Sequence, residues 1–293
     1  MMDAVITYVD GRDPLWQQDY ASVVGGEALT KRYRDWGTLK YLLRGIQKHI
    51  PSVGKVYLIV SRESQVPEWV DRENLRIVLH RDIIPDRFLP TFSSGTIEMF
   101  LHRIPGLAEE FLYFNDDMFP VMDCVAEDFF VDGKSAIGFS RHLLAPNQWK
   151  RRVRNSDRQA RLCLGMKAGL TFVRPQHTTS PMLRSQNEKV FDFSKEKIFR
   201  VAEPLRTDDS FNQYLYLDYL YYQGKTVGKG ISNKHFSPVI YSAEKICPYI
   251  ESPTTKMICI NDVQMPQEKF EYYRSLITAS FERHFPDKSR FER

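Results

Sequence analysis

The sequence predicts an α/β fold in which a mainly parallel β-sheet is flanked by helices. Short apolar runs rich in β-branched and aromatic residues alternate with segments of helical periodicity, the pattern of strands joined by crossover helices. Several of these runs end in Asp or Asn, and the composition, 42% hydrophobic and 27% charged, is that of a globular protein. The length of 293 residues is sufficient for one large α/β domain or two smaller ones.

The first expected strand covers residues 4–9 and is followed at once by Asp10-Gly11. In open α/β sheets, ligands bind outside the carboxyl ends of the strands, so Asp10 is a candidate site residue. A simple Asp-Gly turn is the alternative interpretation. No glycine-rich phosphate loop follows, and a dinucleotide-binding fold of the usual kind is therefore not supported.

The next elements follow from the same patterns. A helix is expected over 38–46, where leucine and isoleucine recur at helical spacing. The further expected elements are strands over 55–61 and 75–80, a turn of helix over 66–70, and a helix over 96–104 with Ser93 or Ser94 at its N-cap.

A fourth strand over 111–114 ends in Asn115-Asp116-Asp117. This polar ending has two interpretations: a turn that satisfies nearby backbone N–H groups, or a site that holds Mg²⁺ or Mn²⁺. Because parallel strands bring their carboxyl ends to one sheet edge, the ending is expected beside Asp10, which favours a site. A later apolar run over 256–260 repeats the pattern and ends in Asn261-Asp262.

The second half of the chain is less regular. Short strands are expected over 128–131 and 136–139, and a closing helix over 268–283. The proline-punctuated stretch 174–181 is predicted to be a loop, in which His177 is either structural or a base or ligand. Arg206 precedes an expected N-cap cluster and an aromatic core helix over 211–222. Helix N-termini and guanidinium groups both favour the binding of phosphate, so Arg206 is a candidate phosphate-binding residue.

Charge and cysteine content exclude several classes of protein. The net charge of +4 suits an anionic substrate but does not indicate nucleic acid, and aromatic residues are sparse in the basic run 150–154. That run is either a solvated helix face or an anion site or surface patch. The four scattered cysteines predict reduced thiols. No signal peptide or membrane span is visible, and we expect a soluble cytoplasmic protein.

Four blocks, taken together and in order, resemble the Stealth family, the bacterial capsular polysaccharide phosphotransferases similar to the catalytic core of N-acetylglucosamine-1-phosphotransferase. The blocks span nearly the whole chain. They are Asp3–Pro14; the stretch from Arg34 to Asp117, which contains Leu89–Ser94, Ile97-Glu98 and His102-Arg103; His177 with Arg206 and Asp208-Asp209; and Ile258–Asp262 with Phe281, Phe285 and Pro286.

The resemblance implies a glycosyltransferase-like (GT-A-type) core with a helical C-terminal portion. It implies one catalytic domain, with a nucleotide-sugar-binding part over 1–120 and an acceptor and catalytic part over 121–293. The implied partners are a UDP-sugar donor and a glycan acceptor, the cofactor is Mg²⁺ or Mn²⁺, and peripheral association with the inner face of the membrane is left open. The implied substrate-binding residues are Tyr8, Asp10, Gly11, Arg34, Ser94, His102 and Arg103; the catalytic residues are His177, Arg206, Asp117 and Asp116; and the metal ligands are Asp117 with Asn261 or Asp262.

Under this hypothesis the chain transfers a sugar-1-phosphate, an N-acetylhexosamine-1-phosphate being expected, from a UDP-sugar to an acceptor hydroxyl and releases UMP. His177 would accept the hydroxyl proton, with Asp116 as the alternative base, and Arg206 would stabilise the phosphoryl oxygens. A metal-dependent glycosyltransferase that releases UDP would use the same aspartates. A non-catalytic module that binds glycan or nucleic acid through the basic run is a third hypothesis.

Overall fold

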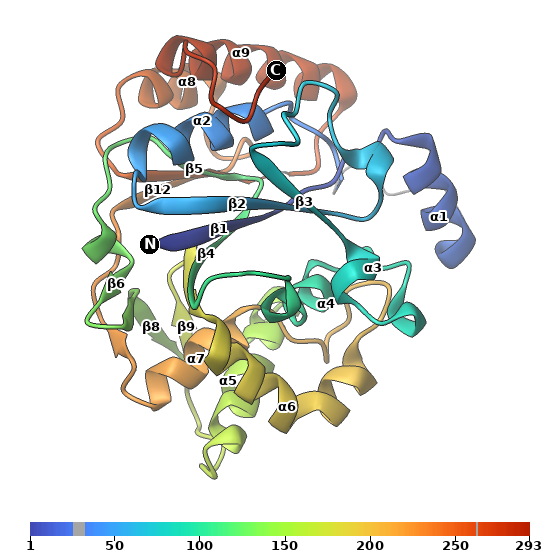
Figure 1. Cartoon of the computed structure of the whole chain (residues 1–293), viewed down its shortest axis with the longest axis vertical. Coiled ribbons are helices and arrows are strands. Elements are labelled where there is room, and N and C mark those ends of the chain that lie inside the picture. The colour runs from blue at the N-terminus through green and yellow to red at the C-terminus, as the bar shows by residue number, and fades with distance from the viewer. Residues whose placement is uncertain (26–32, 262) are drawn as a thin grey trace. The chain divides into compact units, whose positions relative to one another are not determined.

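The computed structural model describes residues 1–25, 33–261 and 263–293 and has an α/β architecture (Figure 1). The chain divides into two units. Unit 1 comprises Met1–Asp3, Val78–Tyr113 and Glu127–Gly230, and unit 2 comprises Ala4–Ile77, Phe114–Ala126 and Ile231–Arg293. Each unit is assembled from three separated stretches of the chain. The expected functional division at residue 120 stays a prediction.

Five strands form the central sheet in the order β10-β4-β1-β2-β3. The sheet is mostly parallel, as predicted, and β10 is antiparallel to β4. In unit 2, β13 is parallel to β12 and antiparallel to β5. The strands are β1 (Met2–Thr7), β2 (Val53–Val60), β3 (Leu75–Leu79), β4 (Glu110–Asn115), β5 (Met118–Pro120), β6 (Phe130–Val131), β7 (Lys134–Ala136), β8 (Phe139–His142), β9 (Phe172–Pro175), β10 (Ser180–Leu183), β11 (Thr226–Val227), β12 (Asn233–Phe236) and β13 (Met257–Ile260).

Helices account for the rest of the regular structure, and α8 and α9 confirm the predicted helical C-terminal portion. The α-helices are α1 (Pro14–Val24), α2 (Leu39–His49), α3 (His80–Ile83), α4 (Ser94–Glu98), α5 (Gln148–Cys163), α6 (Arg184–Val201), α7 (Tyr214–Tyr222), α8 (Ala243–Glu251) and α9 (Gln267–His284). The 3₁₀ segments are η2 (Glu63–Gln65), η3 (Asp86–Phe88), η4 (Leu101–Arg103) and η5 (Ala126–Asp128).

Three local predictions were wrong. The loop expected over 174–181 is shorter and covers only 176–179, because the ends of the stretch belong to β9 and β10. Pro181 is tolerated in β10 because this strand lies at the edge of the sheet, where a missing N–H costs no ladder hydrogen bond on the open side. The helix expected over 96–104 is interrupted, with α4 ending at Glu98 and η4 following, and the helical turn expected over 66–70 is η2, at 63–65.

Unit 2 is held together partly through a buried arginine on α2. Arg44 is 6% exposed, and its Nη2 lies 2.8 Å from Glu292 while its Nη1 lies 3.1 Å from Glu282. Nη1 also donates a hydrogen bond to the carbonyl of Phe285 at 2.6 Å. Helix α2 is therefore tied to α9 and the C-terminal residues, and α8 packs against α9 within the same unit.

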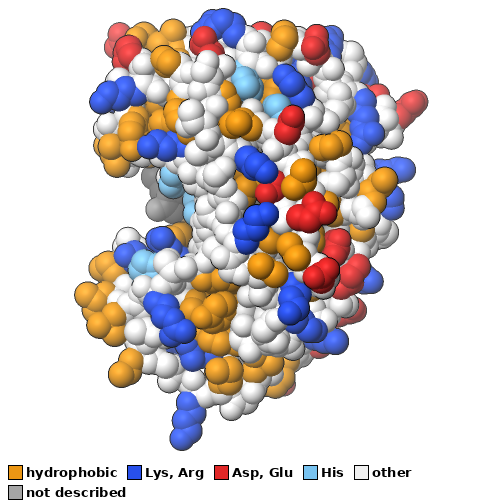
Figure 2. Space-filling view, turned by 90° about the vertical axis from the view of Figure 1, so that its left-hand side faces the viewer, with side chains coloured by type: hydrophobic (Ala, Val, Ile, Leu, Met, Phe, Trp, Pro, Cys, Tyr) orange, Lys and Arg blue, Asp and Glu red, His pale blue; other side chains and the backbone are white. Residues whose placement is uncertain are grey.

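In unit 1, α5 and α7 pack against each other and both contact β9. The tyrosines of α7 are largely buried, which confirms their predicted place in the core. All four cysteines are free thiols, as expected. None of the helices in the described ranges combines the length and apolar character needed to cross a bilayer. On the face shown in Figure 2, hydrophobic side chains are interspersed with Lys and Arg.

Candidate active site

The loop after β1 holds the first candidate residues in unit 2. The N–H of Asp10 donates to Gln65 Oε1 at 2.7 Å, and Gln65 Nε2 donates back to the Asp10 carbonyl at 3.0 Å. Gln65 Nε2 also donates to Asp13, the N-cap of α1, at 2.8 Å. One buried glutamine therefore fixes the backbone at Asp10. Nothing in the sequence pointed to it, because it lies 55 residues further along the chain.

Gly11 is required by close packing. Its N–H donates to the carbonyl of Tyr33 at 2.8 Å, and a Cβ at this position would lie 2.4 Å from that oxygen. No larger residue fits without displacing the backbone. Tyr8, two residues before Asp10, is buried and donates its N–H to Ile59.

Several carboxylates surround this loop. Burial raises the pKa of the Tyr8 hydroxyl well above its usual range, and the carboxylates of Asp35, Asp10 and Asp116 raise it further. Arg12 lies 3.2 Å from Asp10 and 3.1 Å from Asp35. Burial also raises the pKa of Asp35, which was not among the predicted residues although it follows Arg34 in the second block. The carboxylates of Asp10, Asp35 and Asp116 therefore gather near Tyr8, with Arg12 paired to the first two.

Asp116 and Asp117 form the tight turn between β4 and β5, so the turn interpretation is right for the backbone. The side chain of Asp117 does more than close the turn. Its Oδ2 accepts a hydrogen bond from Cys259 Sγ at 3.4 Å, and its carbonyl accepts from the N–H of Ile260 at 2.9 Å. Within the described ranges, its Oδ1 is buried and has no hydrogen-bond partner.

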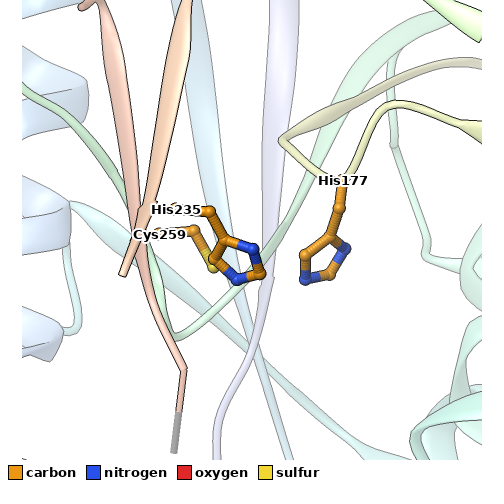
Figure 3. Close-up of side chains that lie close together, drawn as sticks. All are labelled: His177, His235 and Cys259. Carbon is orange, nitrogen blue, oxygen red and sulfur yellow. The ribbon is translucent and has the colours of Figure 1, made fainter. Parts of the chain in front are cut away.

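Asn261 follows β13 and lies near the same point, since Cys259 Sγ is 3.6 Å from Asn261 Oδ1. The predicted ligands Asp117 and Asn261 are thus brought to one thiol, whereas Asp262 lies outside the described residues. His235 is the partner of Cys259 in the β12–β13 ladder, and Figure 3 shows their side chains next to each other.

The donor atoms fit a hard divalent cation. Carboxylate and amide oxygens, such as those of Asp117 and Asn261, are the ligands that Mg²⁺ and Mn²⁺ prefer. A buried carboxylate oxygen without a partner is costly, and a cation would satisfy Asp117 Oδ1. Burial raises the pKa of the Cys259 thiol strongly, and Asp117 raises it further, which agrees with a protonated thiol that donates its hydrogen bond to Asp117.

Unit 1 brings together two of the other predicted residues. Arg206 Nη2 donates to Ser94 Oγ at 3.1 Å, at the first residue of α4. Glu98, at the end of α4, is 3% exposed and accepts from the N–H of Gln213 at 2.7 Å. Burial raises the pKa of Glu98, and the positive charges of Arg152 and Arg206 oppose that shift. Arg206 and Ser94 therefore lie beside a buried carboxylate.

The basic run 150–154 is not simply a solvated helix face. It lies on α5, whose N-cap Asn147 accepts from the N–H of Lys150, and Arg151 pairs with Asp208 at 3.0 Å. Arg152 is only 4% exposed, and its Nη2 donates to the carbonyl of Phe211 at 3.1 Å. Burial lowers its pKa to about 10. The run therefore combines surface cations with one core cation that the sequence did not distinguish.

His177 lies in unit 1 between β9 and β10. Its Nδ1 is 3.1 Å from the hydroxyl oxygen of Tyr214, a residue that is 1% exposed at the start of α7. The ring of Trp149 meets the rings of His177 and Tyr214 edge to face, with centroids 6.4 Å and 6.3 Å away. The imidazole is thus oriented by a buried tyrosine and by an aromatic residue of α5.

Three predicted substrate-binding residues are placed elsewhere. His102 and Arg103 line a pocket of about 470 Å³ against α6, and none of its other lining residues was predicted for the site. Burial lowers the pKa of His102 to about 4. Arg34 donates to the carbonyl of Met265 at 2.9 Å, and its guanidinium lies 4.7 Å from the ring centroid of Phe270, so it packs against the segment at α9.

Comparison with known proteins supports the family resemblance. Residues 32–137 match the family model for Stealth protein CR2, conserved region 2. The capsular polysaccharide phosphotransferase WcwK of Streptococcus pneumoniae is 28% identical over 335 residues, covering 99% of each protein. The chain belongs to the Stealth family. The receptor polysaccharide phosphotransferase WefC of Streptococcus oralis is 44% identical over 138 residues, which is 44% of this chain and 41% of that protein.

Another relative of this Stealth chain is a capsular polysaccharide phosphotransferase of Actinobacillus suis, 33% identical over 248 residues, covering 78% of this chain and 66% of the relative. Among solved structures, the galactosyltransferase LgtC aligns over 95% of this chain and 96% of its own, with 13% identity and a TM-score of 0.44. The glycosyltransferase GlyE of S. pneumoniae TIGR4 aligns over 99% of this chain and 66% of its own, with 14% identity and a TM-score of 0.40.

Proposed function

We propose that this Stealth-family enzyme transfers a sugar-1-phosphate, an N-acetylhexosamine-1-phosphate from a UDP-sugar, to a hydroxyl of an acceptor glycan and releases UMP. The reaction would serve capsular or cell-surface polysaccharide synthesis in the cytoplasm. One observation carries the proposal more than any other. Among the described residues, Asp117 Oδ1 is buried without a hydrogen-bond partner, and Asp117 Oδ2 and Asn261 Oδ1 both lie near the Cys259 thiol.

In this proposal the acceptor oxygen attacks the β-phosphorus of the UDP-sugar, and the bond from that phosphorus to the oxygen of UMP breaks. His177 accepts the proton of the acceptor hydroxyl, with Asp116 as the alternative base. Because the C1–O bond of the sugar is never cut, the anomeric configuration is retained. Arg206, which is exposed and holds Ser94 at 3.1 Å, stabilises charge on the phosphoryl oxygens.

Asp117 and Asn261 would hold Mg²⁺ or Mn²⁺, with Asp262 as a further candidate. Such a cation would neutralise negative charge on the diphosphate of the donor. Tyr8, Asp10 and Gly11 would contact the nucleotide, where the tight backbone of Gly11 and the clamped backbone of Asp10 provide a preorganised surface.

The deciding experiment measures which nucleotide is released. The protein is incubated with Mg²⁺, a panel of UDP-hexoses that includes UDP-N-acetylglucosamine, and short capsular oligosaccharides as acceptors. Release of UMP with the sugar phosphate attached to the acceptor supports the proposal. Release of UDP would show an ordinary glycosyltransferase, and UDP-sugar binding without turnover or metal dependence would show a non-catalytic module.

A further inference from the structure

Unit 1 has a group of unusually exposed apolar side chains outside the candidate site. Leu143 and Leu144 are 61% and 72% exposed, and Leu170 is 92% exposed. Leu162 and Met166, at the end of α5 and in the loop after it, are also exposed. Single exposed leucines are ordinary, but a contiguous group of them indicates an interaction surface.

The backbone brings these residues to one end of the unit. His142 of β8 pairs with Phe172 of β9, so Leu143 leaves the ladder where Leu170 approaches it. Arg161 Nη2 donates to the carbonyl of Thr171 at 3.4 Å, which joins the end of α5 to the same place.

The turn after α5 is tight. Gly165 has a φ of +68°, and the N–H of Met166 donates to the carbonyl of Arg161 at 2.9 Å. Met166 therefore stays beside the helix end that carries Leu162. The backbone therefore places all five apolar residues at the same end of the unit.

The surroundings of the patch are strongly basic. Residues 139–171 contain eight Lys and Arg against one acidic residue, Asp157, which is buried and paired with Arg161. This stretch alone is more positive than the whole chain, whose net charge is +4. Arg158 and Lys167 are exposed, and no acidic side chain in the described ranges pairs with either. Figure 2 shows hydrophobic and Lys or Arg side chains interspersed at its lower end.

We infer that this apolar–basic patch, formed by Leu143, Leu144, Leu162, Met166 and Leu170 with Arg158 and Lys167, docks unit 1 on an anionic lipid surface. Leucines inserted at the interface supply the apolar contribution, and the flanking cations attract acidic headgroups. An anionic bilayer satisfies both features at once. It also agrees with the position of Arg158, one helical turn before Leu162 on the same face of α5.

Flotation of the full chain with vesicles tests this inference, using phosphatidylcholine alone or mixed with phosphatidylglycerol. We expect binding to the mixed vesicles, little binding to the neutral ones, and release at high salt because the Debye length shortens. Leu143→Ser/Leu144→Ser/Leu170→Ser should lower the bound fraction at least about tenfold. Arg158→Gln/Lys167→Gln should weaken binding about fivefold for each charge removed.

The matched control is Val239→Ser/Ile240→Ser, which removes two apolar side chains of unit 2 that are 68% and 75% exposed. This variant should bind like the parent, and all variants should melt at the parent temperature because the changed side chains are exposed. Three results would overturn the inference: no vesicle binding by the parent, equal binding to neutral and anionic vesicles, or full binding by the triple serine variant. Self-association of the parent that the triple variant loses, without vesicle binding, would instead assign the patch to a second copy of the chain.

Discussion

The Nδ1 atom of His177 lies 3.1 Å from the hydroxyl oxygen of Tyr214, at the buried start of α7. If His177 is the base, this contact fixes the orientation of its imidazole ring. Tyr214 is then a positioning residue, since it acts through the imidazole.

Tyr214→Phe should lower kcat about tenfold while the KM for the UDP-sugar stays unchanged, because only the orientation of the base is lost. His177→Ala should lower kcat on the order of 10²-fold or more. Steady-state kinetics across pH checks both, and Tyr219→Phe, on the same helix, serves as the control. If His177→Ala retains full turnover, the base lies elsewhere and Asp116 becomes the candidate.

Asp117→Asn should abolish the increment in UDP-sugar affinity that Mg²⁺ provides, because the buried oxygen proposed to hold the cation loses its charge. Calorimetric titration with and without Mg²⁺ measures this increment. Asp123→Asn, an aspartate of the same unit whose side chain is 90% exposed, should keep it. If Mg²⁺ still raises the UDP-sugar affinity of Asp117→Asn as much as that of the parent, Asp117 is not a ligand of the proposed metal.

The stability of unit 1 should fall as pH rises, through Asp218. This carboxyl group is fully buried, neither oxygen has a hydrogen-bond partner in the described ranges, and burial followed by the charge of Asp157 raises its pKa strongly. The folded state therefore keeps a proton that the unfolded chain releases above about pH 4, so raising the pH favours unfolding.

Asp218→Asn removes this dependence, because the amide does not titrate. As the pH rises, the unfolding free energy of the variant should therefore increase relative to that of the parent by up to about 1.4 kcal/mol per pH unit. Urea unfolding at pH 5 and pH 8 measures it. Parallel pH profiles for the two proteins would contradict the assignment.

Gly95→Ala should destabilise the protein by about 1–3 kcal/mol. A Cβ there would lie 2.3 Å from Arg152 Nη2 and 2.4 Å from the carbonyl of Phe211, so the buried arginine must shift. Gly228→Ala is the control, since nothing lies within 4 Å of its added Cβ, and it should change stability by less than about 0.5 kcal/mol. Equal melting temperatures for the two variants would show that the Arg152 side chain can move away from the added Cβ without loss of folding free energy.

Much of this arrangement follows from local pattern. The strand-then-Asn-Asp layout marked both polar endings, and the family resemblance implied that Asp117 and Asn261 or Asp262 hold one metal; Cys259 contacts both Asp117 and Asn261. The contact itself depends on the pairing of Cys259 with Met118 across β13 and β5, which no local pattern encodes. Long-range hydrogen bonds such as Gln65 to Asp10 are equally hidden, because a glutamine has no preferred partner until the fold is known.

Other differences arise where tertiary contacts override local preference. Pro181 indicated a loop, yet an edge strand accommodates it. Arg152 read as one of several surface cations, but its hydrogen bond to Phe211 and the charge of Glu98 place it in the core. His102 and Arg103 were grouped with Ser94 because all three belong to the second block of the family resemblance. The chain changes from α4 to η4 between them, and His102 and Arg103 line the pocket at α6.

The interleaving of the two units has a consequence for synthesis on the ribosome. The last stretch of unit 2 begins at Ile231 and contains β12 and β13, so β5 has no partner strand until β13 has been made. The turn that carries Asp116 and Asp117 is synthesised before Glu127–Gly230, whereas Cys259, which donates a hydrogen bond to Asp117, is synthesised after that segment. A nascent chain arrested near residue 230 holds every segment of unit 1 but lacks β13, the strand that pairs with β5 beside the turn at Asp116 and Asp117.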